Sequence, residues 1–255
     1  MPELEFEKKN FLVIGSSSGI GLATAKALHN GGATVVLHGP TVQPNKEVEN
    51  LISTPHFHYI AGDLSDLNSC ESLIDRACEK ISSLDGFVFA AGTKSHVEWE
   101  KISVSEWEKV LAINEGSFLF LAQKAAPHLR KSKGSIVAVS STNAERVNKK
   151  NLVYDVSKAG LNHLIKALAL ELRDDGVRVN GVMPGGIDTP LLKDWLVDYA
   201  GSHEEAERVL SQGRADGSIG KPEDIADVIT FLLSNKARWI TGEIVTADFG
   251  VSLFT

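Results

Sequence analysis

The chain has 255 residues, of which 43% are hydrophobic and 23% charged, close to an average soluble domain, and these values exclude a disordered or collagen-like chain. It carries 26 lysine and arginine residues against 33 aspartate and glutamate residues, a net charge of −7, so bulk charge favours neither nucleic acid nor an anionic membrane as a partner. No uninterrupted apolar run reaches the 18 or so residues that a membrane-spanning helix needs.

The two cysteines and the chain ends indicate where the protein resides. Cys70 and Cys78 would lie about 12 Å apart along a helix, farther than a disulfide reaches, so a reducing compartment is the simpler interpretation. The opening MPELEFEKKN is acidic and lacks an apolar signal core, and the final VSLFT carries no lipidation motif. We therefore expect a cytoplasmic protein.

Short β-branched runs alternate with segments of helical periodicity along the chain. The runs predict strands at residues 11–14, 34–37, 57–60, 86–90, 135–139, 177–182 and 243–246. Helical spacing predicts helices near residues 20–30, 45–53, 66–81, 103–131, 152–174 and 222–234. This alternation predicts an α/β fold: a single-domain, doubly wound Rossmann-type parallel sheet, residues 1–255, with helices on both faces.

Residues 183–221 are the least regular stretch, and they are long for a connection between a strand and a helix. Long loops in compact domains are often lids or binding loops. We expect a substrate lid at residues 188–215; the alternative is a plain surface excursion.

A glycine cluster, Gly15-Ser16-Ser17-Ser18-Gly19-Ile20-Gly21, follows the first predicted strand and opens the first helix. Gly15 permits a tight turn, Gly19 lets the backbone approach a pyrophosphate, and Gly21 allows close helix–strand packing. The helix N-terminus offers N–H groups to an anion. A strand-to-helix turn needs glycine anyway, but this position in a doubly wound sheet favours a nucleotide site.

Tyr154, Lys158 and Ser141 form a candidate acid–base set. Tyr154 and Lys158 are four residues apart on a predicted helix and share one face, and Ser141 follows the strand at residues 135–139. An ammonium roughly 4–5 Å from a phenol contributes about 3–4 kcal/mol at an effective dielectric near 20. We therefore expect Lys158, helped by an oxidised nicotinamide, to lower the pKa of Tyr154 so that it exchanges a proton with a substrate hydroxyl, while Ser141 holds the same oxygen.

The combination resembles the short-chain dehydrogenase/reductase family over nearly the whole sequence. The matching motifs are Gly15–Gly21, Asp63-Leu64, Ala91-Gly92, Asn114, the set Ser141, Tyr154 and Lys158, the segment from Pro184-Gly185 to Thr189, Gly220 to Ala226, Thr241-Gly242, and Asp248-Phe249-Gly250. The resemblance implies hydride transfer between NAD(P)(H) and a ketone or secondary alcohol. Ile14 and Phe89-Ala90 depart from the family pattern, and we expect these changes to alter packing and not catalysis.

The resemblance implies a set of site residues. Asn114, Ser141, Tyr154 and Lys158 are the expected catalytic residues, with Asn114 holding a water beside the lysine. The expected cofactor contacts are Gly15, Ser17, Ser18, Gly19, Ile20, Gly21, His38, Asp63, Leu64, Ala91, Gly92, Asn114, Tyr154, Lys158, Pro184, Gly185, Ile187 and Thr189. The expected substrate contacts are Ser141, Asn143, Tyr154 and Trp195, and no metal site is expected.

The end of the second predicted strand bears on the choice between NAD and NADP. Family members that prefer NAD usually carry an acidic residue where this chain has Gly39, and many NADP members carry arginine near Pro40 or at Ser18, which is absent here. Ser17, Ser18, His38 and Thr41 could hydrogen-bond a 2′-phosphate. The missing carboxylate leads us to expect NADP(H), with NAD(H) as the alternative.

The substrate is open between a 3-oxoacyl compound and a sugar or polyol. Trp195, Leu191, Leu192, Val197 and Tyr199 would form an apolar lid or anchor the lid helix, and His96 and Trp99 could also line the pocket. Arg146, Lys149 and Lys150 would attract an anionic substrate or lie in a solvated loop.

A non-catalytic dinucleotide-binding sensor of the same fold is the alternative function, but it predicts damage to the Ser-Tyr-Lys set, which is intact. A dehydratase or epimerase of the extended branch of the family usually has a larger C-terminal substrate domain. The segments at residues 118–122 and 161–170 are apolar around most of their circumference, so we expect a homodimer or homotetramer, or burial by the chain's own loops.

Overall fold

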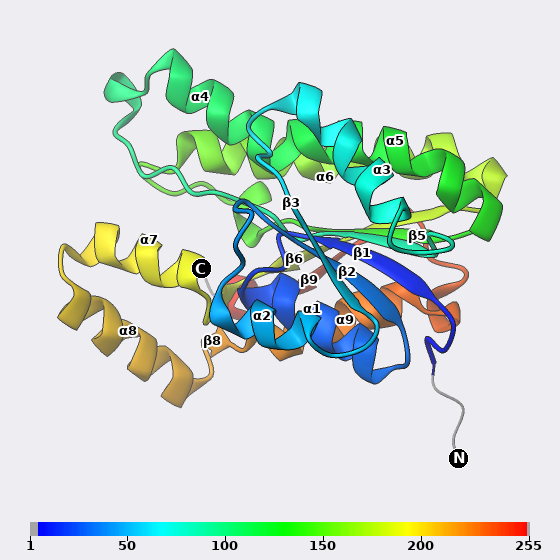
Figure 1. The fold of residues 1–255 in the computed structure, drawn as a ribbon. Helices are drawn as coiled ribbons and strands as arrows, with labels where there is room; N and C mark the ends of the chain where they lie inside the picture. The colour runs from blue at the N-terminus through cyan, green and yellow to red at the C-terminus, as the bar shows by residue number, and fades with distance from the viewer. Residues whose placement is uncertain (1–4, 254–255) are drawn as a thin grey trace.

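Seven short strands rich in β-branched and aromatic residues form one parallel sheet in the computed structural model, which describes residues 5–253 (Figure 1). They are β1 (Asn10–Ile14), β2 (Thr34–Gly39), β3 (Phe57–Ala61), β4 (Gly86–Phe89), β5 (Ser135–Val139), β6 (Arg178–Pro184) and β9 (Ile244–Ala247). Their order is β3-β2-β1-β4-β5-β6-β9, and every neighbouring pair is parallel. The strand order therefore reverses between β1 and β4, where doubly wound sheets open a ligand crevice.

Helices cover both faces of the sheet (Figure 1). They are α1 (Gly19–Asn30), α2 (Lys46–Ile52), α3 (Cys70–Cys78), α4 (Val104–Leu111), α5 (Ser117–Ser132), α6 (Leu152–Leu172) and α9 (Pro222–Leu233), with short 3-10 turns at Leu67–Ser69, Trp99–Lys101, Thr142–Ala144, Arg173–Asp175, Asn235–Ala237 and Val251–Leu253. Side chains alternate along β1: Leu12 joins the core beneath α3, α5 and α6, and Val13 joins the core beneath α1 and α9. Burial on both faces explains why the strands are continuous apolar runs.

All seven predicted strands and the doubly wound fold are confirmed. The predicted helix at residues 103–131 is instead interrupted by a π-helical turn, Ala112–Gly116, between α4 and α5. Such turns add a residue to the helix and redirect the side chains on it. Asn114 lies on this turn and is fully buried.

The stretch predicted to be irregular contains two helices, α7 (Pro190–Ala200) and α8 (His203–Asp216), and a short parallel strand pair, β7 (Gly186–Ile187) with β8 (Ile219–Gly220). Figure 1 shows α7 and α8 beside the sheet layers, and a small cluster of Leu196, Ala206 and Leu210 joins the two helices. Few positions of α7 and α8 are buried, so their apolar periodicity is weak, and the sequence predicted a lid at residues 188–215 without the bounds of these two helices.

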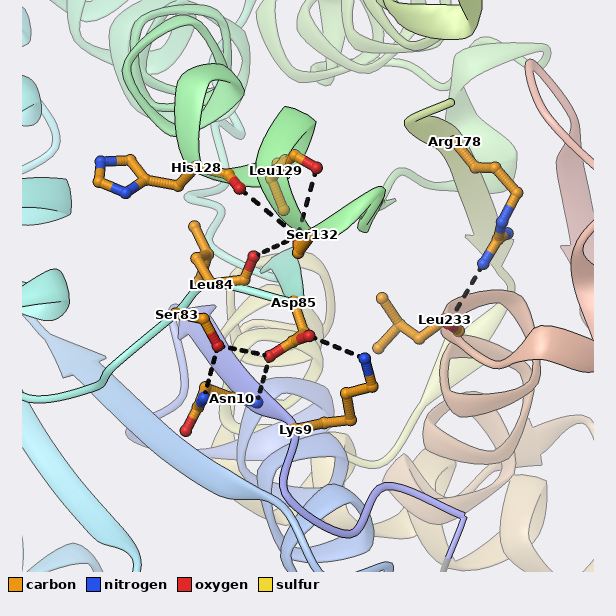
Figure 2. A network of polar contacts seen from close by, with 10 residues as sticks. All are labelled: Lys9, Asn10, Ser83, Leu84, Asp85, His128, Leu129, Ser132, Arg178 and Leu233. Atoms are coloured by element: carbon orange, nitrogen blue, oxygen red, sulfur yellow. Dashed lines mark hydrogen bonds and ion pairs between the residues drawn. The ribbon is translucent and has the colours of Figure 1, made fainter. Parts of the chain in front are cut away.

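A polar network lies at the amino ends of the central strands, opposite the ends that carry the predicted site (Figure 2). Asp85, just before β4, accepts hydrogen bonds from Lys9 Nζ at 2.9 Å and from the Asn10 backbone N–H at 3.0 Å. Ser132 at the end of α5 donates to the Leu84 carbonyl at 2.7 Å, and Arg178 donates to the Leu233 carbonyl at 3.1 Å. These bonds satisfy backbone groups where strands begin.

Cys70 and Cys78 are both free, and no helix within residues 5–253 is long and apolar enough to cross a membrane. In the apolar segments expected to meet a partner subunit, Phe118, Leu121, Leu161 and Ile165 are fully buried by the chain itself. These four residues belong to the chain's own core, whereas Leu170 in the second segment is 66% exposed.

Candidate active site

A cleft of about 590 Å³ lies along the carboxyl ends of the central strands, a size typical of small-molecule sites. The predicted site residues that line it are Gly15, Ser17, Ser18, Gly19, Ile20, His38, Asp63, Leu64, Ala91, Gly92, Ser141, Asn143, Tyr154, Lys158, Pro184, Gly185, Ile187, Thr189 and Trp195. Gly21 and Asn114 lie outside this lining, and both act on residues that belong to it.

The glycine loop is a cradle that only glycine can form. Gly15 and Gly19 have φ angles of +75° and +54°. A Cβ on Gly15 would lie 2.5 Å from the Ala91 nitrogen, and a Cβ on Gly21 would lie 2.3 Å from the Gly15 carbonyl oxygen. Gly21 therefore lets α1 pack beneath the loop, and the open backbone above the N-terminus of α1 fits the pyrophosphate of a dinucleotide.

His38, at the end of β2, is hydrogen-bonded to the glycine loop. It is buried, its Nδ1 accepts a hydrogen bond from the Gly15 N–H at 3.2 Å, and its Nε2 lies 3.2 Å from the Gly62 carbonyl oxygen, to which the neutral tautomer donates. Burial lowers the pKa of His38 to about 4, so the ring is neutral near pH 7. Because both ring nitrogens bond to backbone groups, the prediction that His38 binds a 2′-phosphate is revised: His38 positions the glycine loop.

Two further residues shape the cofactor end of the cleft and were missed from the sequence. Asn45 caps α2 through its side-chain oxygen and donates from Nδ2 to the Ser17 carbonyl at 2.7 Å; its place just before a predicted helix was the available signal. Tyr59 donates to the Thr41 carbonyl at 2.7 Å, and its hydroxyl would lie 2.6 Å from a Cβ at position 39. Position 39 therefore has no room for a side chain while the Tyr59 hydroxyl binds the Thr41 carbonyl.

Asp63, Pro184 and Gly185 border the same cleft on opposite sides of the glycine loop. Asp63 accepts hydrogen bonds from the Ser65 N–H and hydroxyl, which hold the pKa of its carboxyl below the usual range. Thr189 caps α7 by accepting from the Leu192 N–H at 3.3 Å, and its methyl group faces Gly19. The lid helix thus begins directly over the glycine loop.

The sequence-predicted acid–base set comes together in the middle of the cleft. Tyr154 and Lys158 lie one turn apart on α6, and Ser141 follows β5 and hydrogen-bonds the Tyr154 hydroxyl. The Lys158 ammonium lies 5.8 Å from the centre of the Tyr154 ring and donates to the Val139 carbonyl at 3.0 Å. Lys158 is 3% exposed, so its long side chain is held in one direction.

Burial shifts the pKa values of both Tyr154 and Lys158. Burial raises the pKa of Tyr154 and outweighs the Ser141 hydrogen bond, which lowers it, while the charge of Asp155 raises it further. Burial also lowers the pKa of Lys158 to about 8. Within the protein itself, desolvation therefore disfavours the charges of both groups; the expected lowering of the Tyr154 pKa, which includes the charge of an oxidised nicotinamide, stays a prediction.

Asn114 lies behind Lys158 and not on the cleft surface. Its Oδ1 accepts from the Thr93 N–H at 2.8 Å, and its Nδ2 donates to the Thr93 carbonyl at 3.0 Å and to the Ser157 hydroxyl at 2.9 Å. A Cβ on Gly92 would lie 3.5 Å from Lys158 Nζ and 3.7 Å from Asn114 Oδ1, so the two polar groups face each other across Gly92. Asn114 therefore ties the loop after β4 to α6.

The lid helix meets the rest of the site through Trp195. Its indole N–H donates to Asn151 Oδ1 at 3.2 Å, and its ring stacks on Tyr199 with ring centres 5.4 Å apart. Trp195, Leu191 and Leu192 line the cleft. The other two lid candidates do not line it: Val197 packs against the cluster between α7 and α8, and Tyr199 is exposed.

Lys94, which the sequence did not single out, holds α7 from the opposite wall of the cleft. Its ammonium donates to the Asp194 carbonyl at 2.7 Å and forms an ion pair with Asp198. His96 packs edge-on against Trp195 with ring centres 6.1 Å apart, whereas Trp99 is exposed.

Two of the three basic residues between Ser141 and Tyr154 contact other parts of the chain. Arg146 donates to the Ser252 carbonyl, and Lys150 lies 4.0 Å from Glu98.

The family model described as "Enoyl-(Acyl carrier protein) reductase" matches residues 14–252. The chain is 33% identical to the 3-oxoacyl-[acyl-carrier-protein] reductase of Aquifex aeolicus over 98% of this chain and 99% of that protein. It is 30% identical to the glucose 1-dehydrogenase of Gluconobacter oxydans, over 98% and 94% of the two chains.

The solved structure of Thermoplasma acidophilum aldohexose dehydrogenase superposes with a TM-score of 0.87 at 28% identity, covering 99% of this chain and 97% of that one.

Proposed function

The chain belongs to the short-chain dehydrogenase/reductase family, and on that premise we propose that it is an oxidoreductase that transfers a hydride between NAD(P)(H) and a ketone or secondary alcohol. The observation that carries the proposal is the hydrogen-bonded pair Ser141 and Tyr154 beside a buried Lys158, in a cleft whose other end is a glycine cradle. A sensor without catalysis would have no use for this buried set.

The cofactor would be held by the glycine loop, by Asp63 and Leu64, by Ala91 and Gly92, and by the segment from Pro184 to Thr189. When bound, the nicotinamide supplies or accepts the hydride. Its ring would lie near Tyr154, because the glycine loop and the Pro184–Thr189 segment border the cleft from both sides. Lys158 is 3% exposed and residues of α7 line this part of the cleft, which limits the access of water to the reacting atoms.

Tyr154 is the proposed general acid and base. In carbonyl reduction its hydroxyl donates a proton to the carbonyl oxygen, and in alcohol oxidation the phenolate accepts one. The Ser141 hydroxyl bonds the same substrate oxygen and orients it. Asn143 and Trp195 are the proposed contacts for the rest of the substrate, and residues 188–215 its lid.

The reaction class is tested with a panel of 3-oxoacyl esters, cyclic ketones, sugars and polyols, followed by the change in reduced-nicotinamide absorbance. Turnover with at least one ketone or secondary alcohol is expected. Cofactor binding without turnover on any member would favour the sensor.

We propose that NADP(H) is preferred over NAD(H), because Gly39 presents no carboxylate to repel a 2′-phosphate. Ser17, Ser18 and Thr41 are the proposed phosphate contacts. A carboxylate at position 39 would repel the phosphate by several kcal/mol at roughly 4 Å and an effective dielectric near 20. The preference should therefore reverse when a carboxylate is introduced.

An aspartate at position 39 would collide with the hydroxyl of Tyr59, which occupies the space beside Gly39, so this hydroxyl must be removed as well. The test compares Tyr59→Phe with Tyr59→Phe/Gly39→Asp. The first is expected to keep the NADP preference, and the second to lower kcat/KM for NADP relative to NAD by at least about tenfold. A wild-type enzyme that turns over faster with NAD would contradict the proposed preference.

We also propose that the protein assembles as a homodimer or homotetramer. β9 is an edge strand of the sheet, Trp239 shortly before it is 96% exposed, and Leu170 on α6 is 66% exposed. Light scattering at micromolar concentration is expected to give a mass of two or four chains. A monomer under these conditions would argue against assembly.

A further inference from the structure

Asp155 is a buried carboxylate immediately after Tyr154 that the mechanism above does not use. It is 5% exposed, and burial raises its pKa. Burying a carboxylate is unfavourable unless hydrogen bonds replace its water. Its position beside the proposed proton donor therefore calls for a structural reason.

Both carboxylate oxygens bind the loop that follows β5. Oδ1 accepts from Asn143 Nδ2 at 2.8 Å, and Oδ2 accepts from the Asn148 backbone N–H at 2.9 Å. Both partners are neutral amides that belong to opposite ends of the turn. One side chain of α6 thus fastens the start and the end of the segment at residues 143–148.

The 143–148 loop is connected by hydrogen bonds to Ser141 and Tyr154. The Asn143 N–H donates to the Ser141 hydroxyl at 3.2 Å, and Ser141 hydrogen-bonds Tyr154. Consecutive residues of α6, Tyr154 and Asp155, therefore hold the two ends of one chain of polar contacts. Asn143 and Asn148 line the main cleft and, with Asp155, a second pocket of about 350 Å³ behind the loop.

We propose that Asp155 is a positioning residue for the oxidoreductase reaction: its carboxylate clamps the 143–148 loop onto α6, so that Ser141 and Asn143 present a fixed wall to the substrate oxygen. The inference rests on the proposed function, because the fixed wall matters only if a substrate reacts at Tyr154. A wall that is free to move holds the substrate oxygen less tightly, so loosening it lowers kcat/KM.

The clamp requires two acceptor oxygens on one short side chain. Asparagine at position 155 has a similar shape but one acceptor oxygen, so with the Asn143 amide oriented as it is only one of the two bonds survives, and the charge that strengthens both bonds is lost in either orientation of that amide. Its amide group would then face another donor. Asp155→Asn should therefore loosen the loop without creating a cavity.

The test compares Asp155→Asn with Asp174→Asn, which removes the same charge from an exposed position whose side chain is 92% exposed. Asp155→Asn is expected to lower kcat/KM about ten- to hundredfold, mainly through a higher substrate KM, because a hydrogen bond to a charged group is lost. Cofactor affinity, measured by quenching of protein fluorescence, is expected to change less than twofold. Asp174→Asn is expected to match the wild type in each measurement.

A pH profile separates positioning from a general loss of structure. The Asp155 charge raises the pKa of Tyr154, so its removal is expected to move the acid limb of alcohol oxidation to lower pH. The other charged groups around this end of α6 are Lys158 on the helix, Glu145 and Arg146 on the loop, and Glu115 on the π-helical turn beside Gly160. They are the same in both variants, so the shift reports on Asp155.

Hydrogen exchange keeps the inference testable apart from turnover. Faster exchange of residues 143–148 in Asp155→Asn, with the rest of the chain unchanged, supports the clamp even if the wild type has no activity, an outcome that would reject only the proposed function. If exchange, KM and the pH profile all match the wild type, the clamp is refuted.

Discussion

Tyr154→Phe is expected to abolish turnover, lowering kcat by about 10²- to 10⁴-fold, the range that a general acid–base group contributes. The ring and its packing on α6 are retained, and only the hydroxyl that bonds Ser141 is removed. Nothing else in the cleft is proposed to donate a proton to the carbonyl oxygen. The measurement is kcat for carbonyl reduction at saturating cofactor and substrate, on the best member of the substrate panel.

Tyr199→Phe is the matched control, because Tyr199 stacks on Trp195 but is exposed and does not line the cleft. It is expected to keep kcat within about twofold. Cofactor binding by Tyr154→Phe should also persist, since the glycine loop is separate from the phenol. Turnover retained in Tyr154→Phe would reassign the proton donor.

Lys158→Met is expected to separate stability from activity. Burial lowers the pKa of Lys158 from 10.5 to about 8, so folding at pH 7 carries an electrostatic cost of about 3 kcal/mol. Methionine removes this cost but leaves the Val139 carbonyl without its donor, a loss of about 1 kcal/mol. The variant should therefore be more stable than the wild type by about 2 kcal/mol in urea unfolding without cofactor, and lose about 10²-fold or more in kcat/KM.

The pH dependence of this difference has a definite sign. A lysine whose folded pKa lies below its unfolded pKa destabilises the protein fully below the folded value, and the cost disappears as pH rises through the range between them. The advantage of Lys158→Met should therefore be constant well below pH 8, fall to zero at about pH 10, and reverse above about pH 10.5, where only the lost hydrogen bond to the Val139 carbonyl remains.

Lys166→Met, on the exposed side of the same helix, controls for the loss of a surface charge and should change the free energy of unfolding by less than about 0.5 kcal/mol. A Lys158→Met variant that is less stable than the wild type at pH 7 would mean that the ammonium is better solvated than its burial implies. A gain in stability with loss of activity is the pattern expected of a group kept for function.

Lys158 and Asp155, which lie within one turn of α6, differ in how well their buried charges are hydrogen-bonded. Lys158 and Asp155 are both buried, but the first has one carbonyl as its partner and the second has two amides. Burial disfavours the charge of both groups, and the hydrogen bonds offset it more fully for Asp155. The proposed catalytic lysine and the proposed positioning aspartate therefore lie on one turn of α6, and each binds its own partners.

The sequence alone determined the seven strands of the sheet and most of the helices between them, the glycine loop, and the set of Ser141, Tyr154 and Lys158. These features are local: a buried parallel strand is a continuous apolar run, a glycine at positive φ has few substitutes, and residues four apart on a helix share a face. The spacing of Tyr154 and Lys158 was therefore readable before any coordinates, and the family resemblance added Asn114 and the cofactor contacts.

Only the tertiary structure decided what depends on contacts between distant segments. Both ring nitrogens of His38 are taken by Gly15 and Gly62, Tyr59 fills the space beside Gly39, and Lys94 reaches α7 across the cleft. The burial that raises the pKa of Tyr154 in the protein itself is also a tertiary effect, because desolvation depends on how much chain surrounds a group and not on its neighbours in sequence. Partners and burial are set by the packing of the whole chain, and a local pattern does not carry that information.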